Sequence, residues 1–488
     1  MIKIDELNEL QLTSIDPITK EQYYNFIELL KNSISFIKNI PNNKTIRVIS
    51  HLDADGITAA ALIVNALQNE NKEYDLSIYS QLTDDVCKEL AKEEYKYYII
   101  TDLGSSQLSS INNHLKDKKI LIMDHHVPQE KANDNIVHIN PHLIGIDGST
   151  FIAGSGVVFF YSVLLNNKNS EMAHLPIIGA IGDVQEKQGF SGLNNVILEI
   201  AIERKKIIPK KELNLYGKQT RPLYKLLEFS SDLNIPGITN NQNSAVLFLN
   251  QLGIKHIKDN GELRTFYDLK EEEKKKLTEA IIIKRMNAGI TDQTNLFNIT
   301  YEIVDEEKGT FKDAKEFSSI LNACGRMDQA KTGVYTCLNQ DNYKNEAHQV
   351  QKDYKIEIVH GMNWLKKQIK DKSNSIIQNK KFMIINAQTN IMHTIIGTIA
   401  SILTMGNTYP EDYYILSLAH NIPEKTIKVS LRIVGNNKEI DLQKIITTII
   451  EKLGTGEAGG HQHAAGAVIP LDKEAAFLEI AEDVLEGL

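Results

Sequence analysis

The feature that most constrains the fold is the alternation of short β-branched runs with helical stretches over about the first 190 residues. Runs at 45–50, 96–101 and 119–123 have the composition of buried strands. Apolar spacing predicts a helix at 57–68 and further helical segments at 154–167 and 173–182. Because strands that alternate with helices form mostly parallel sheets, we expect an α/β fold.

The middle of the chain has a different residue pattern. From about 190 to 290, charge runs such as Glu271–Lys276 fall on helical patterns, which we interpret as solvated faces of a mainly helical insertion. Strand-like segments return at 297–303, 382–385, 413–417 and 427–432, with helices expected at 314–323 and 440–452. The 488 residues suffice for two or three domains. We expect a mostly parallel-sheet domain over 1–215, a helical insertion over 216–290, and a C-terminal α/β domain over 291–488, with a cleft between the two α/β domains.

Composition and charge narrow the function classes. No apolar run is long enough to span a bilayer, the first residues lack the pattern of a signal peptide, and the three scattered cysteines do not suit a disulfide framework. These features predict a cytoplasmic protein. The net charge of -9 argues against a passive DNA-coating protein. It does not argue against an enzyme that concentrates positive charge in a groove and binds divalent metals.

Clusters of carboxylates and imidazoles stand directly after three predicted strands, and one more acid stands at an expected helix end. In chain order they are His51, Asp53 and Asp55; Asp102; Asp124, His125 and His126; and Asp183. The first three alternate, so an extended segment would direct them to one side. Because ligands bind at the carboxyl ends of strands in open parallel sheets, we expect these clusters to converge.

Such a convergence predicts a pair of hard divalent cations. Crowded carboxylates would repel one another without a cation, and their combination with imidazoles favours Mn²⁺, with Mg²⁺ as the alternative, over zinc. A lone aspartate after a strand, such as Asp102, is more often only a helix cap, so the prediction rests on the combination. Two metals about 3.5–4 Å apart activate a shared water and clamp a phosphate. The predicted reaction is therefore hydrolysis of a phosphate ester or anhydride.

A glycine-rich segment near the C-terminus, Gly454–Gly466, contains two histidines. A flexible turn is the commoner interpretation of such a segment, but glycines also let backbone amides approach an anion closely. We expect a loop that closes over the first site, with His461 donating to a phosphate oxygen.

These residues carry a family resemblance. His51–Gly56, Asp102, Asp124–His126 and Asp183 resemble the four motifs of the DHH phosphoesterases in the same order, and Gly459–Gly466 resembles the signature of the DHH-associated C-terminal domain. The resemblance covers roughly residues 45–190 and 295–488. The segment Glu316–Arg326 and the helical insertion look like archaeal RecJ-like proteins, a subgroup that includes the nuclease associated with the GINS replication complex.

The resemblance implies a role for each matching residue. Asp53, Asp55, Asp102, His125 and Asp183 would be metal ligands, with Asp102 and Asp183 as bridges. His51 lies two residues before Asp53, whereas many members have a histidine four before, so His51 would either coordinate a metal or support a ligand. Asp124 would orient a histidine and His126 would neutralise charge on the phosphate, which together with Asp102 gives the catalytic set. The substrate-binding candidates are Arg432, Ser430, Gly459, Gly460, His461 and, unless it only forms a surface salt bridge, Arg326.

The resemblance also implies a function: a metal-dependent exonuclease on single-stranded DNA or RNA, in DNA replication or repair, with GINS and the replicative helicase as candidate partners. Two alternatives stay open. One is a phosphodiesterase for small molecules or oligoribonucleotides, of the nanoRNase or cyclic-dinucleotide type, although such relatives are usually shorter and lack the insertion. The other is a structural, GINS-binding helicase cofactor, whose eukaryotic relative has lost ligands that are intact here.

Overall fold

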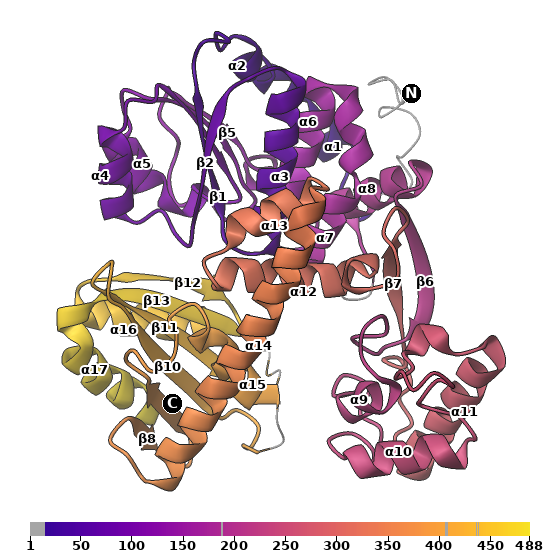
Figure 1. Cartoon of the computed structure of the whole chain (residues 1–488). Helices are drawn as coiled ribbons and strands as arrows, with labels where there is room; N and C mark the ends of the chain where they lie inside the picture. Colours follow the sequence, from indigo (N-terminus) through magenta and orange to yellow (C-terminus); the bar gives the residue numbers. More distant parts are fainter. Residues whose placement is uncertain (1–14, 187–188, 406–407, 436, 438) are drawn as a thin grey trace. The chain divides into compact units, whose positions relative to one another are not determined.

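The computed structural model describes residues 15–186, 189–405, 408–435, 437 and 439–488. The chain divides into two compact units, unit 1 up to Val350 and unit 2 from Gln351 to Leu488, and each is described by itself. Figure 1 labels most of their helices and strands.

Unit 1 is built on a five-stranded parallel sheet with the strand order β2-β1-β3-β4-β5. The strands are β1 (Ile46–His51), β2 (Tyr74–Tyr79), β3 (Tyr97–Thr101), β4 (Lys119–Met123) and β5 (Ile136–Ile139). This sheet confirms the predicted α/β fold. The strand order reverses direction between β1 and β3, and in open parallel sheets this is the point at which ligands bind, beside the carboxyl ends of the strands.

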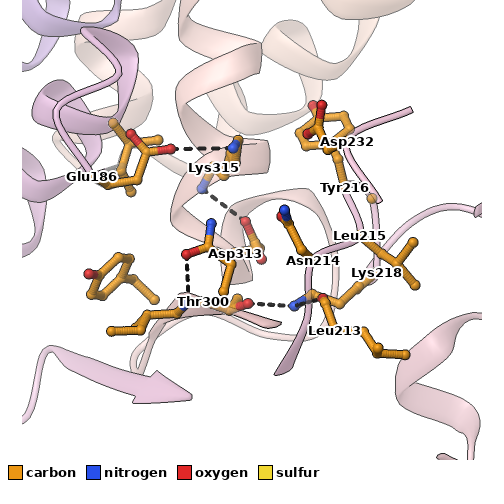
Figure 2. A pocket seen from close by; sticks show the side chains of 15 residues that line it. Glu186, Leu213, Asn214, Leu215, Tyr216, Lys218, Asp232, Thr300, Asp313 and Lys315 are labelled. Atoms are coloured by element: carbon orange, nitrogen blue, oxygen red, sulfur yellow. Dashed lines mark hydrogen bonds and ion pairs between the residues drawn. The ribbon is translucent and has the colours of Figure 1, made fainter. Parts of the chain in front are cut away.

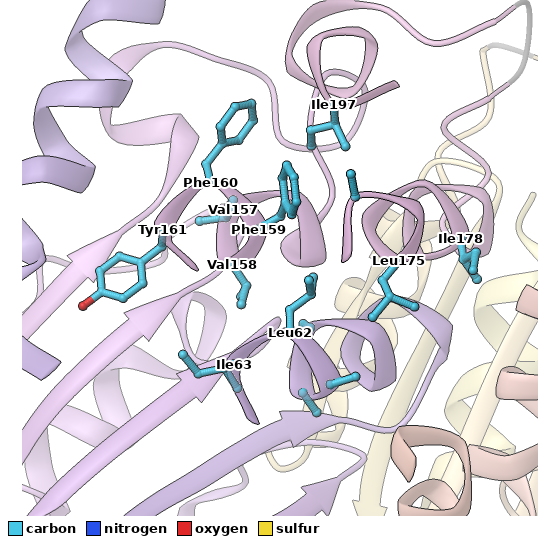
Figure 3. Close-up of a cluster of buried hydrophobic side chains, with 14 of the residues drawn as sticks. Leu62, Ile63, Val157, Val158, Phe159, Phe160, Tyr161, Leu175, Ile178 and Ile197 are labelled. Carbon is cyan, nitrogen blue, oxygen red and sulfur yellow. The ribbon is translucent and has the colours of Figure 1, made fainter. Parts of the chain in front are cut away.

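Alternate side chains of the central strands enter two separate cores. Val48 and Ile99 pack on one face of the sheet, whereas Ile49 and Ile100 pack on the other. The first face is covered by α1 (Lys20–Ser33), α2 (Ser35–Lys38), α3 (Ala54–Asn69), α6 (Gly154–Leu165), α7 (His174–Gly182) and α8 (Gly192–Glu203). The second is covered by α4 (Asp84–Lys92) and α5 (Leu108–His114). Figure 3 shows the first core, where side chains of α3, α6 and α7 meet. Both faces are buried, so the central strands are rich in apolar residues such as Val48, Ile49, Ile99 and Ile100.

An antiparallel ribbon brackets the insertion. Its strands are β6 (Ile207–Leu213) and β7 (Phe297–Ile303), and Leu213 pairs with Phe297. Between them lie α9 (Leu223–Glu228), α10 (Gln242–Gln251) and α11 (Glu271–Asn287), which share an apolar core of their own. The predicted helical character of the insertion is confirmed. The ribbon strand β6 was not predicted, because Pro209 and charged residues face solvent along it.

Unit 1 continues beyond the ribbon with α12 (Ala314–Arg326) and α13 (Ala330–Cys337). Both helices pack on α3, and α12 also packs on α7. The long helix α14 (Asp341–Lys370) then crosses the boundary between the two units.

Unit 2 contains a six-stranded mixed sheet with the strand order β12-β13-β11-β10-β9-β8. The strands are β8 (Ile376–Gln378), β9 (Phe382–Asn386), β10 (Tyr414–Asn421), β11 (Thr426–Ile433), β12 (Glu457–His461) and β13 (Ala464–Pro470). Helices α16 (Leu442–Leu453) and α17 (Glu474–Glu486) share one core with the sheet. On β11, Ser430 faces Gly397 of α15 (Ile396–Met405), while its neighbour Leu431 enters the core with α16 and α17.

The glycine-rich segment corrects one expectation. The predicted loop is wrong, because most of this segment forms the paired strands β12 and β13, with Gly459 opposite Gly466 and Gly460 opposite Ala465. β13 pairs in turn with β11, so much of its backbone is engaged in the sheet ladder.

Two further features concern the chain as a whole. Within the described ranges, no helix has both the length and the apolar character needed to cross a bilayer. Cys87, Cys324 and Cys337 are buried free thiols.

Candidate metal centre

The strand ends bring the predicted ligands to one place. His51 is the last residue of β1, Asp102 directly follows β3, and Asp124 directly follows β4. Asp53 caps α3, where its Oδ1 accepts a hydrogen bond from the Gly56 amide at 3.0 Å. The helix cap explains one oxygen of Asp53 and leaves the other available to the cluster.

The first ligand group consists of His51, Asp53 and Asp102. His51 Nδ1 lies 3.0 Å from Asp53 Oδ2 and 3.5 Å from Asp102 Oδ2. The structure therefore places His51 among the candidate ligands.

The second ligand group consists of Asp55, His125 and Asp183. His125 Nε2 lies 3.3 Å from Asp183 Oδ2 and 3.8 Å from Asp55 Oδ2. It also lies 3.3 Å from Asp102 Oδ1. The two oxygens of Asp102 thus face different groups, with Oδ2 toward His51 and Oδ1 toward His125.

Four atoms in these groups are suited to bind a cation. His51 Nδ1, both carboxylate oxygens of Asp102 and His125 Nε2 are buried and form no hydrogen bond with any described residue. Buried polar atoms are otherwise hydrogen-bonded, because an unpaired group loses its hydration without compensation. Asp183 adds to the imbalance, since it caps the C-terminal end of α7, where the helix dipole disfavours a carboxylate. The oxygen and imidazole donors match hard divalent cations.

Asp55 is held in place by the start of α6. Its Oδ2 accepts a hydrogen bond from the Gly154 amide at 2.6 Å, and its Oδ1 accepts one from the Ser155 amide at 3.1 Å and another from the Ser155 hydroxyl. The helix N-terminus favours the ionised form of this buried side chain. Two glycines make room here: a Cβ on Gly154 would lie 2.5 Å from Asp102 Oδ1, and one on Gly179 would lie 2.4 Å from Asp55 Oδ1.

A chain of buried amides supports His125. The ring directs its Nδ1–H toward the carbonyl of Gly148, 2.8 Å away, which leaves Nε2 facing the acids. The Gln185 side chain donates to the same carbonyl at 3.0 Å, and the Asn194 amide donates to Gln185 Oε1 at 2.6 Å. Asn194 Oδ1 also accepts the Ala153 amide at 3.4 Å, beside the α6 start that holds Asp55. Sequence reasoning missed Gly148, Ser155, Gln185 and Asn194, because they are ordinary residues outside the motifs.

Asp124 is engaged by hydrogen bonds from its neighbours, and it also belongs to a third candidate group with Asp102, His125 and His126. Its Oδ1 accepts the His125 amide at 2.7 Å, the His126 amide at 3.2 Å and the His126 ring Nδ1 at 2.8 Å. Its Oδ2 accepts the Ser105 amide at 2.8 Å. Burial opposes ionisation, but His126, His125 and these amides outweigh it and hold the pKa of Asp124 well below its usual range. Asp124 is therefore placed to orient His126.

The electrostatics show carboxylates that crowd one another. Burial, with the nearby charge of Asp102, raises the pKa of Asp55 to about 7. Burial, with the charge of Asp55, raises the pKa of Asp183 well above its usual value. Burial opposes protonation of His125, yet Asp102, Asp183 and Asp55 outweigh it and raise the pKa of His125.

The backbone at Asp102 is itself unusual. Its φ of +54° lies in the left-handed region, which costs a side-chain-bearing residue on the order of 1 kcal/mol or more. The amide of Asp102 donates to the carbonyl of Met123 at 2.9 Å, which fixes this turn against β4. The turn brings the Asp102 carboxylate between the two ligand groups.

The remaining predicted residues lie outside this cluster. Arg326 ends α12 in unit 1, beside Gly325, whose backbone is so close to Leu52 that an added Cβ would clash with it. In unit 2, Ser430 is opposite Gly466, which is opposite Gly459, and Arg432 is opposite Ala464, which is opposite His461. These residues form two adjacent rows across β11, β13 and β12. The side chain of His461 lies outside the described part of the structure.

Comparison with known proteins places the chain in a family. Residues 45–180 match the DHH family, N-terminal domain; residues 215–296 match the DHH-CID domain; and residues 379–487 match the DHHA1 domain. The chain belongs to the DHH family. Members of this DHH family are phosphoesterases, and a DHH relative from Methanocaldococcus jannaschii, described as an uncharacterized protein, is 31% identical over 452 residues, covering 90% of this chain and 93% of that protein.

Other DHH relatives are more distant. The single-stranded-DNA-specific exonuclease RecJ of Dickeya dadantii is 23% identical over 200 residues, which are 36% of this chain and 34% of that protein. RecJ of Thermus thermophilus, solved with Mn²⁺, aligns with a TM-score of 0.55 at 15% identity, over 97% of this chain and 57% of that one. CDC45 of Entamoeba histolytica aligns with a TM-score of 0.60 at 13% identity, over 95% and 99% of the two chains. The structural similarities to RecJ and CDC45 show that this chain has a RecJ-like fold.

Proposed function

We propose that this DHH protein is a metal-dependent exonuclease that hydrolyses phosphodiester bonds in single-stranded DNA or RNA. The observation that carries the proposal is the position of the Asp102 carboxylate. Its Oδ2 lies 3.5 Å from His51 Nδ1 and its Oδ1 lies 3.3 Å from His125 Nε2. A carboxylate between two donor groups suits a bridge between two hard cations.

Two divalent cations are part of the proposal, with Mn²⁺ favoured and Mg²⁺ as the alternative. The ligands would be His51, Asp53, Asp55, Asp102, His125 and Asp183. When bound, such a pair lowers the pKa of a water molecule and polarises a phosphate oxygen.

The chain's own residues would position the substrate. Asp124 accepts from the His126 ring at 2.8 Å, which fixes the partly exposed imidazole, and in this proposal the ring would face the reacting phosphate. His126 would donate a proton to a phosphate oxygen as negative charge develops there. Arg432, Ser430, Gly459, Gly460 and His461 of the C-terminal domain would bind phosphates next to the scissile one, and Arg326 is a further candidate.

The domain boundaries at 215, 290 and 488 and the cleft between the α/β domains remain predictions within this proposal. So do a cytoplasmic location, a role in DNA replication or repair, and association with GINS and the replicative helicase. The likeness to CDC45 concerns the fold, while the complete set of candidate ligands favours catalysis over a purely structural role.

The test compares wild type with Asp102→Ala on end-labelled DNA and RNA strands of several lengths, with Mn²⁺ and with a chelator. Asp85→Ala, at an exposed position on α4, is the control. We expect the Asp102 variant to lose activity on the order of 10³-fold and the control to match wild type. A wild type that cleaves only dinucleotides or other small phosphodiesters would favour the small-molecule alternative. One that cleaves nothing but binds GINS would favour the structural alternative.

A further inference from the structure

The base of the insertion carries a cluster of cations stacked on aromatic rings. The guanidinium carbon of Arg221 lies 4.9 Å from the ring centre of Tyr216 and 5.4 Å from that of Phe229. Lys225 Nζ lies 5.2 Å from the Phe229 ring and 5.9 Å from the Tyr224 ring. We call these five residues the stacking cluster.

Two members of the stacking cluster, Phe229 and Arg221, can make further contacts with a ligand. Phe229 is 50% exposed, although a phenylalanine usually buries its ring. The guanidinium of Arg221 forms no hydrogen bond or salt bridge with any described residue, although its charge interacts with the Glu316 carboxylate, so its N–H donors can bind a ligand. Lys225, in contrast, is bound by Glu228 at 2.8 Å and Gln242 at 2.7 Å. The aromatic rings fix the plane of Arg221 without consuming its N–H groups.

The loop that carries Tyr216 and Arg221 is anchored to the body of unit 1. Figure 2 shows the adjoining pocket, in which Lys218 extends to Thr300 of β7. Lys218 Nζ also contacts Glu212 Oε2 at 3.0 Å. The Gln219 amide donates to Glu316 of α12 at 3.0 Å, and the Thr220 hydroxyl donates to the same carboxylate. The stacking cluster is therefore held by α12.

The same helix reaches the candidate metal centre. Asn322 of α12 accepts the Ala54 amide at 3.1 Å, between the candidate ligands Asp53 and Asp55. Glu316 and Asn322 are six residues apart, which corresponds to about 9 Å along an α-helix. One rigid element thus connects the stacking cluster to the metal centre within unit 1.

Charge supports an anionic ligand at this place. Residues 215–296 contain 12 Lys and Arg against 10 Asp and Glu, whereas the whole chain contains 54 against 63. The insertion is a slightly positive segment in an acidic chain. Local positive charge of this kind attracts a polyanion to one part of a protein.

We propose that the stacking cluster is a second contact for the single-stranded substrate, several nucleotides away from the scissile phosphate. Phe229 would stack on a base, and Arg221 would bind a backbone phosphate through its free N–H groups. The proposal extends the function proposed above and rests on it for the identity of the strand. It implies that long strands bind more tightly than strands too short to reach the cluster.

The test measures binding without turnover. Fluorescence anisotropy in a chelator gives Kd for thymidine strands of about 20 and about 4 nucleotides. Phe229→Ala should raise Kd for the long strand about tenfold and leave the short strand unchanged, while Phe229→Trp should retain tight binding. Arg221→Gln should weaken long-strand binding and reduce the slope of log Kd against log salt by about 0.7, the value for one phosphate contact.

Lys255→Gln and Leu247→Ala are the controls, an exposed cation and an exposed apolar residue elsewhere in the insertion, and both should bind like wild type. An unchanged Kd in the Phe229 and Arg221 variants would overturn the proposal, and so would a lower Tm with unchanged Kd, which would identify the cluster as structural. If the Phe229 and Arg221 variants lose binding of polyglutamate but not of thymidine strands, the ligand of the cluster would be an acidic protein, and the proposal would also be overturned. Binding is measured without cleavage. A wild type that binds strands but does not degrade them would therefore refute the proposed nuclease activity without refuting the proposed binding by the stacking cluster.

Discussion

The ring Nδ1 of His125 donates a hydrogen bond to the main-chain carbonyl of Gly148, 2.8 Å away. This contact selects the tautomer that presents the Nε2 lone pair to a cation. The Gly148 carbonyl is held in turn by Gln185, and Gln185 is held by Asn194, which is only 1% exposed. The position of a candidate ligand therefore depends on an asparagine of α8.

Asn194→Asp should weaken Mn²⁺ binding about 10-fold or more, because a carboxylate cannot donate to Gln185 and the support of His125 is lost. Isothermal calorimetry measures the affinity, and cleavage at saturating Mn²⁺ measures the remaining activity. Asn169→Asp is the matched control: Asn169 is also fully buried and donates to the Ser162 carbonyl at 2.8 Å, but belongs to neither ligand group. Equal affinities in the two variants would show that the chain of amides has no influence on the metal.

Metal affinity should rise as the pH increases from about 6 to 8. Burial raises the pKa of Asp55 to about 7, so this carboxyl is largely protonated at the lower end of this range, and burial raises the pKa of Asp183 in the same direction. A cation must displace these protons, and less displacement is needed as the pH rises. Calorimetry in buffers of different ionisation enthalpy should therefore detect proton release on Mn²⁺ binding near neutral pH. An observed heat that does not depend on the buffer would contradict this expectation.

Gly154→Ala should reduce activity on the order of 10²-fold, because the new Cβ would lie 2.5 Å from Asp102 Oδ1 and 2.8 Å from Asp102 Cβ. Steady-state cleavage of a labelled strand, with circular dichroism to verify folding, provides the measurement. Gly361→Ala in α14 introduces the same methyl group opposite the flexible end of Ile399, at 3.2 Å, and should retain normal activity. If both alanine variants cleave normally, the close approach at Gly154 is not required.

Asp183→Asn should stabilise the metal-free protein while removing its response to metal. The raised pKa of Asp183, caused by burial and by Asp55, means that ionising this group costs the folded state free energy. For an acid with a raised folded-state pKa, stability falls as the pH rises from the unfolded to the folded value. At about pH 8 the amide should therefore increase the free energy of unfolding on the order of 1 kcal/mol. Thermal unfolding in a chelator and in Mn²⁺ tests both parts, and a lower Tm in the chelator would refute the first.

The sequence allowed the central part of the fold to be predicted, and the reasons are physical. β1, β3 and β4 are buried on both faces, so each is rich in β-branched and other apolar residues that stand out in the sequence. The edge strands β2 and β5 were missed because polar and partly exposed residues interrupt them. The sequence predicts a loop at β12 because glycine disfavours strands, whereas pairing with β13 and packing against α16 stabilise a strand there.

The convergence of the candidate ligands could also be predicted, since the rule for strand ends needs only the strand positions. The residues that hold these ligands in place could not be predicted. Ser155 contacts Asp55, and Asn194 contacts the Gln185 side chain that supports His125. Both contacts arise from the packing of α6 and α8, and such packing leaves no pattern in the sequence. The split of the Asp102 oxygens between two groups likewise depends on a left-handed backbone that no local sequence signal specifies.

The ribbon of β6 and β7 has a consequence for how this family can diversify. Leu213 and Phe297 are paired, so the insertion begins and ends at adjacent points of unit 1, about 5 Å apart. A tight turn of a few residues could join the two strands, and the segment between them has its own apolar core. The insertion can therefore be replaced by another module, in evolution or by design, without changing the strands that carry the candidate ligands.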